Sequence, residues 1–273
     1  MGTSHRHKPA GSPNWGNASK AVSQISKDVN ESDELSNNPP KNTSPQKIAR
    51  RQSVLGKRIT RSYHHAVRDI IRASGGRRSV AKGESRVMGH SGVYYAGAFT
   101  STFQEIAEQG LSTWLKEKGV STIEGKTTKE VVVLLSGFIH DYFTGLDDTA
   151  AREALEAVND MIEEQVLLND GDFDKTFQEV VSSELIKDYL DVFFGVYIFS
   201  HLSQSFSERL QKNYGFEEAN ATMLEIKSLI IDDVKRGYNN RPAGQIDWKG
   251  DEGKKFISQE FERIILILTN NED

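Results

Sequence analysis

The first four residues of this 273-residue chain, Met1-Gly2-Thr3-Ser4, could present a reactive group. Because glycine is small, we expect Met1 to be removed, which would leave the free α-amine of Gly2 at the start of the chain. N-myristoylation of such a glycine requires Ser or Thr at position 6, and this chain has Arg6 there. The sequence therefore predicts an exposed glycine amine without a myristoyl anchor.

A run of basic residues at positions 47–86 is the second feature with a clear chemistry. It contains twelve Lys and Arg residues but only two acidic residues, Asp69 and Glu84. Ammonium and guanidinium groups bind phosphate oxygens, so this run could contact a nucleic-acid backbone. The candidate contact residues are Arg50, Arg51, Lys57, Arg58, Arg61, Arg68, Arg72, Arg77, Arg78, Lys82 and Arg86.

The distribution of charge along the chain offers two further partners for the basic run. Residues 1–90 contain 17 Lys and Arg against 6 Asp and Glu, whereas residues 91–273 contain 17 against 33. The basic run could therefore dock on the acidic remainder of its own chain, or on an acidic protein. The sequence leaves these alternatives open beside nucleic acid.

Motifs for catalysis and metal binding are weak. The chain has no cysteine, which excludes thiolate nucleophiles, disulfides and cysteine zinc sites. The stretch "VLGKRIT" lacks the upstream glycine and the Ser or Thr after Lys57 that a Walker phosphate loop needs. His64 and His65 are adjacent and should point to different helix faces, and His201 is typical of a core or surface histidine with a satisfied ring. We therefore predict that the protein is not an enzyme and holds no cofactor and no metal.

The elements that must position these groups are helices. Thr127 and Glu130 have the spacing of a capping box, which predicts a helix start. Residues 189–202 are apolar nearly all round, which indicates a buried central helix. The helical pattern around them is long, so we expect the helix to be interrupted near Ser182 or Gly195. Few segments alternate as strands do, and no βαβ pattern occurs. The fold class is therefore mainly α.

The expected organisation has three parts. Residues 1–45 are rich in Ser, Asn, Pro, Gly and Lys and have little to bury, so we expect a disordered leader or linker. A basic helical segment at 46–90 and an acidic, bundle-like helical body at 91–273 follow. No run reaches 18 uncharged apolar residues and no secretory signal is visible, so we expect a cytoplasmic protein with no membrane partner.

The stretch 75–89 resembles the QatB family. The residues that carry this resemblance are Gly75, Gly76, Arg77, Arg78, Ala81, Arg86, Met88 and Gly89. The Met-Gly-Thr-Ser start and the helical stretches at 129–162 and 189–210 are also similar to that family. The resemblance implies a non-catalytic component of the four-gene Qat anti-phage defence systems. Its implied partners are an ATPase, a QueC-like enzyme and a TatD-like nuclease.

The resemblance also gives the N-terminus a role. QueC-type enzymes use ATP to activate a carboxylate on 7-deazaguanine, which an amine then attacks. It implies that the QueC-like partner engages the N-terminal peptide and can modify Gly2, whose α-amine has a reference pKa of about 7.7–8.0. Thr3 and Ser4 would be small polar recognition groups. The charged residues after Ser4 depart from the Gly/Pro-rich leader that the family suggests. The alternative function is a nucleic-acid-binding adaptor that acts through 47–86.

Overall fold

The computed structural model describes residues 12–41, 43–139, 145–169, 172–236 and 246–269. These ranges contain eleven helices and no strand, so the expected mainly α class is confirmed. The helices are α1 (Pro13–Asn37), α2 (Pro45–Ala73), α3 (Arg77–Ala81), α4 (His90–Gln109), α5 (Leu111–Glu117), α6 (Thr128–Ile139), α7 (Leu146–Leu167), α8 (Phe173–Val180), α9 (Ser183–Tyr214), α10 (Phe216–Arg236) and α11 (Asp251–Leu268).

Helix α9 is the centre of the core, as its apolar sequence predicted. Every residue from Tyr189 to Ile198 is buried, and α9 contacts α4, α7, α10 and α11 as well as both N-terminal helices. The Phe194 ring stacks on Phe261 of α11 with ring centroids 4.1 Å apart, and Phe193 packs against Phe99 of α4. Side chains from several helices therefore meet on one buried rod.

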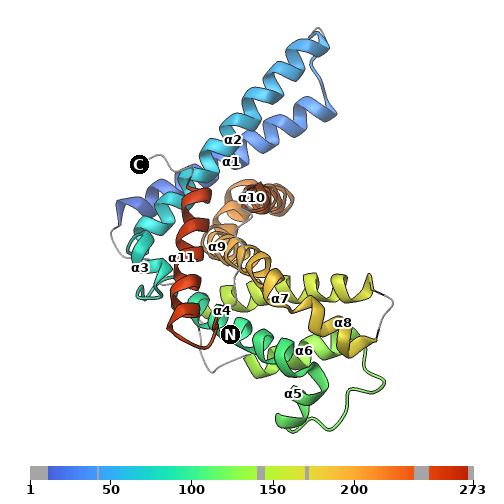
Figure 1. Cartoon of the computed structure of the whole chain (residues 1–273). Helices are drawn as coiled ribbons and strands as arrows, with labels where there is room; N and C mark the ends of the chain where they lie inside the picture. The colour runs from blue at the N-terminus through green and yellow to red at the C-terminus, as the bar shows by residue number, and fades with distance from the viewer. Residues whose placement is uncertain (1–11, 42, 140–144, 170–171, 237–245, 270–273) are drawn as a thin grey trace.

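The expected disordered leader is wrong for Pro13–Asn37, which forms helix α1. Ala18, Val22, Ile25 and Val29 are buried along one side of this helix. Such a narrow apolar stripe in a polar sequence cannot stabilise an isolated helix. It is stable here because α2 runs antiparallel beside it, and Figure 1 shows this hairpin projecting away from the other helices. Residues 1–11 lie outside the described residues.

The predicted helix boundaries in the body are largely confirmed. The capping box forms, because the Thr127 N–H donates to the Glu130 carboxylate at 2.8 Å and the Glu130 N–H donates to Thr127 Oγ1 at 3.2 Å. The expected break falls at Ser182, between α8 and α9, and the chain stays helical through Gly195. Helix α2 begins at Pro45 and continues without interruption to Ala73.

Candidate functional site

A basic groove runs along α2 where the hairpin meets the body. It consists of two adjoining hollows of about 640 and 380 Å³ that share Arg68 and Thr269 as lining residues. Helix α2 forms one wall, and residues of α3, α10 and α11 contribute the remainder. Figure 1 shows α2, α3 and α11 side by side at this end of the molecule.

The structure divides the eleven candidate phosphate contacts into three groups. Three pair with carboxylates of the chain itself: Arg51 with Glu31, Arg58 with Asp28, and Arg77 with Glu262. Five line the groove, namely Lys57, Arg61, Arg68, Arg72 and Arg78, and four of them, all but Arg72, form no ion pair with any described residue. Arg50, Lys82 and Arg86 are exposed and lie outside it. Of these three pairs, only Arg77 with Glu262 joins the basic run to the acidic remainder at 91–273, because Glu31 and Asp28 belong to α1. The groove keeps a concentrated positive surface.

The lining of the groove includes side chains that the basic run did not reveal. Asp233 and Arg236 come from α10, and Thr269 directly follows α11. Arg236 is paired with Asp233, whose pKa is raised by burial although the guanidinium opposes that shift. Only the tertiary structure could reveal them, because they lie 160 residues or more beyond α2 in the sequence.

The two adjacent histidines both line the groove, which corrects the expectation that they serve different faces. His64 is buried, and its Nδ1 lies 2.9 Å from the carbonyl oxygen of Leu268. That carbonyl can only accept, so Nδ1 carries a hydrogen and Nε2 points to Asp233, 3.6 Å away. His65 is half-buried beside it. A neighbouring pair can share one wall where the groove is wide.

A buried polar cluster around Asp147 fixes the start of α4. The Asp147 carboxylate accepts from the backbone N–H groups of Gly89 and Ser91, at 3.1 and 2.7 Å, and from the Tyr197 hydroxyl. His201 Nε2 lies 3.0 Å away, so the predicted histidine with a satisfied ring is confirmed, and the structure places it in the core. Burial would raise the pKa of Asp147, but the hydrogen bonds from His201, Tyr197 and Ser91 hold it below its ordinary value. The charged carboxylate thus caps a helix in place of a local side chain.

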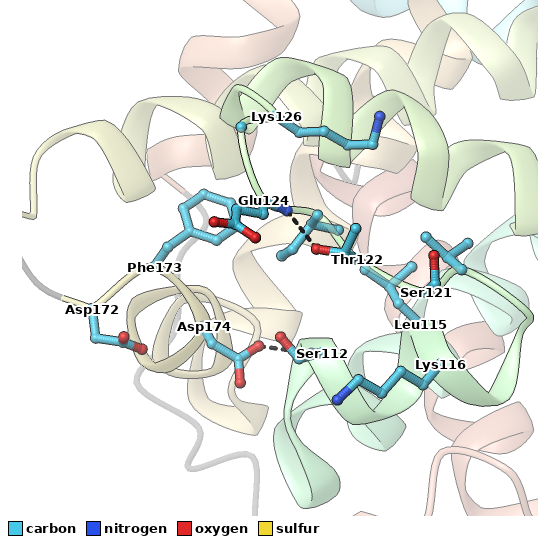
Figure 2. Close-up of a pocket in the computed structure, with 13 residues that line it drawn as sticks. Ser112, Leu115, Lys116, Ser121, Thr122, Glu124, Lys126, Asp172, Phe173 and Asp174 are labelled. Atoms are coloured by element: carbon cyan, nitrogen blue, oxygen red, sulfur yellow. Dashed lines mark hydrogen bonds between the residues drawn. The ribbon is translucent and has the colours of Figure 1, made fainter.

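A third hollow, of about 540 Å³, lies between α5, the loop after it and the start of α8. Figure 2 shows Lys116 and Lys126 on opposite sides of this hollow and the Phe173 ring beside Glu124. Asp174 faces α5, where its Oδ1 accepts from the Ser112 N–H at 2.7 Å. The lining mixes two lysines with three carboxylates, so this hollow lacks the excess of positive charge that distinguishes the basic groove.

The predicted N-terminal site residues Gly2, Thr3 and Ser4 lie outside the described residues. The described chain begins where α1 is fixed to the body. Trp15 packs on Phe206 of α9 with ring centroids 5.3 Å apart. The predicted N-terminal site is therefore followed closely by an anchored helix, and not by a long linker.

Among the described residues, no group of three or more His, Cys, Asp or Glu side chains is placed to hold a metal ion. No helix in the same ranges has both the length and the hydropathy that a bilayer crossing requires.

The fold and groove define a helical protein with a basic face at the base of an N-terminal hairpin. Residues 75–268 match the family model described as Qat anti-phage system associated protein QatB. This chain therefore belongs to the QatB family, and it is a component of the Qat anti-phage defence system. No curated protein and no solved structure matches it.

The family match begins within the stretch that carried the resemblance. Gly75, Gly76 and Gly89 adopt positive φ angles of 102°, 90° and 113°, and Met88 is fully buried. These glycines reverse the chain between α2 and α4, a conformation that other residues rarely adopt. These motif residues therefore have a structural role, because they set the path of the chain between α2 and α4. The hairpin up to residue 73 and the N-terminal segment lie outside the match.

Proposed function

We propose that this chain is a non-catalytic subunit of the Qat system and that a QueC-like partner enzyme engages its N-terminal peptide. The observation that supports this proposal is the Met1-Gly2-Thr3-Ser4 sequence. It lies a few residues before an anchored helix in a member of the QatB family. In its full form the partner conjugates a 7-deazapurine to Gly2. The Gly2 nitrogen forms a C–N bond to the activated carboxyl carbon, the bond to the AMP leaving group breaks, and the amine loses a proton.

The anchored start of α1 limits where the partner can bind. Gly2 lies ten residues before Ser12, and an extended chain spans at most about 3.3–3.6 Å per residue. The amine can therefore reach about 35 Å from the first turn of α1. A 45-residue disordered leader would have reached several times farther. The proposed partner must accordingly place its active site close to Trp15 and α9, which favours a docked complex over loose capture of a tail. The ATPase and the TatD-like nuclease are proposed as further partners in the same system.

A Gly2→Pro substitution is the first test of this proposal. A secondary ring nitrogen in place of the primary amine should abolish conjugation, and phage protection should be lost with it. The measurement is the intact mass with N-terminal peptide mapping of the untagged protein, co-expressed with the neighbouring genes, followed by plaque counts. The expected wild-type result is a chain that lacks Met1 and carries a deazapurine-sized addition on Gly2.

The matched control for this test is Gly11→Pro, the same exchange nine residues later. It should keep both the added mass and protection, because it leaves the first four residues intact. Full protection by the Gly2→Pro variant would rule out the N-terminal role altogether. An unmodified Gly2 in wild-type protein, with protection still lost in the variant, would restrict the role to docking.

A further inference from the structure

We propose that the basic groove binds the phosphate backbone of nucleic acid without reading its sequence. This inference concerns a different surface from the N-terminal peptide and goes beyond the proposed function. The groove residues that carry it are Lys57, Arg61, Arg68, Arg72 and Arg78, with Arg77 and Arg236 at its edges. These residues are a subset of the basic run together with Arg236 of α10.

The cations on α2 form a line that matches a polymer. Lys57, Arg61, Arg68 and Arg72 are separated by 4, 7 and 4 residues, which places them on one face of the helix. At 1.5 Å per residue the line is about 22 Å long. The phosphates of one DNA strand follow each other at about 3.4 Å along the helix axis, so several can lie against such a line. A single nucleotide would meet only a part of it.

Several of these charges have no partner of their own. Within the described part of the chain, Lys57, Arg61, Arg68 and Arg78 form no ion pair, although three neighbouring arginines do. The Nε atom of Arg68 is buried, and no hydrogen-bond acceptor for it occurs among the described residues. A buried donor without an acceptor is costly, and an anion in the groove would satisfy it. Arg68 lines both hollows, so this donor lies at the middle of the groove.

The character of the lining favours a phosphate backbone over other polyanions. Among the described residues no Phe, Tyr or Trp lines either hollow, so the groove offers bases only the smaller rings of His64 and His65 for stacking. The groove offers arginines, whose planar forks suit phosphate, and the hydroxyls of Ser53, Thr60 and Thr269. Exposed apolar residues that would hold the side chains of an acidic peptide are few. The lining therefore predicts contacts to the phosphate backbone that do not depend on the base sequence. Duplex nucleic acid can make these contacts.

The test measures binding of the full-length chain to fluorescein-labelled 20-base-pair DNA duplexes of two unrelated sequences by anisotropy at 50–200 mM salt. Four phosphate contacts predict a salt slope of about −3.6, which corresponds to a loss of affinity of about 100-fold over this range. The double variant Arg61→Gln and Arg68→Gln should make the slope shallower by about 2. Because Lys57 and Arg61 are both exposed, Lys57→Gln with Arg61→Gln is a second pair that leaves the packing unchanged.

The matched control removes two positive charges outside the groove, through Arg50→Gln and Arg86→Gln. It should retain nearly all of the affinity and the slope. Equal weakening by the control pair would show only a general charge effect and would overturn the groove. So would absence of binding at 50 mM salt, a strong preference for one duplex sequence, or tighter binding of poly-glutamate. The intact mass of the same variants separates this result from the N-terminal proposal, because the groove variants should keep any addition on Gly2.

Discussion

A Gly89→Ala variant is expected to unfold about 6–12 °C below the wild type. An added Cβ would lie 2.2 Å from the carbonyl oxygen of Val80, and the φ angle of 113° is one that alanine rarely adopts. Because the obstacle is backbone, the chain itself must shift, which withdraws the Gly89 N–H from Asp147. Strain and the lost cap together should cost about 3 kcal/mol. For a chain of this size each kcal/mol lowers Tm by about 2–4 °C, and a thermal melt measures the change.

Gly97→Ala in the same helix is the control for that variant. A Cβ at Gly97 would meet only Ile257 Cδ1, at an ordinary distance of 4.0 Å, in regular helical backbone. Alanine stabilises a helix interior by up to about 1 kcal/mol relative to glycine. The Gly97→Ala melt should therefore match or slightly exceed the wild type. If the two variants melted together, the contact between Gly89 and Val80 would not be the constraint that we describe.

The second large effect is expected from Arg263→Met. Arg263 of α11 lies between two buried carboxylates, with Nη2 at 2.5 Å from both Asp191 Oδ1 and Glu260 Oε1. Removal of the guanidinium leaves these acids facing each other in the core, where breaking such a pair costs about 3–5 kcal/mol. Thermal and denaturant melts at pH 7 should show this loss. Lys254→Met, which removes an exposed ion pair on the same helix, should change stability by less than about 0.5 kcal/mol.

Addition of Asp191→Asn to Arg263→Met should recover part of the lost stability. The amide has nearly the shape of the carboxyl group but cannot ionise, so residue 191 adds no second negative charge beside Glu260 at any pH. A double variant as unstable as the single one would mean that lost packing of the Arg263 stem caused the destabilisation. Uncompensated buried charge would then not be its cause. The comparison is a double-mutant cycle measured at one pH.

Asp191→Asn alone should flatten the dependence of stability on pH. Burial and the neighbouring Glu260 raise the pKa of Asp191 to about 8, although Arg263 opposes the shift. An unfolded aspartate has a pKa of about 3.9, so between pH 4 and 8 the folded state holds one more proton. The free energy of unfolding of the wild type should then fall by about 1.4 kcal/mol per pH unit as pH rises through this window. Melts at pH 5, 6 and 7 compare the slopes, and parallel slopes would contradict the raised pKa.

The sequence alone determined the features that depend on local pattern. The run at 189–202 is apolar on every side, and such a helix can only be stable when it is covered, so its central place followed directly. The capping box at Thr127 and Glu130 was readable because both partners lie within one turn. The glycine and arginine spacing at 75–89 led to the QatB family.

The sequence did not determine α1, because its stability is shared with another element. A few small or medium apolar residues in a polar stretch do not offset the entropy of ordering it, and they bury surface mainly against α2, with further contacts to α9 and α10. The same separation hid the helix cap at α4. Asp147 lies 58 residues after Gly89, and nothing near Gly89 in the sequence indicates which carboxylate will reach it.

The basic run at 47–86 shows both what the sequence determined and what only the tertiary structure decided. Composition located its charge, and the helical period placed Lys57, Arg61, Arg68 and Arg72 on one face. Which charges are neutralised was decided by tertiary structure, because Glu31, Asp28 and Glu262 approach from other helices. Asp233 and Arg236 reach the groove only because α10 packs beside α2 in the folded chain. Charge is a property of the sequence, but a binding surface requires those charges to be brought together and left unpaired, which only the packing of distant helices achieves.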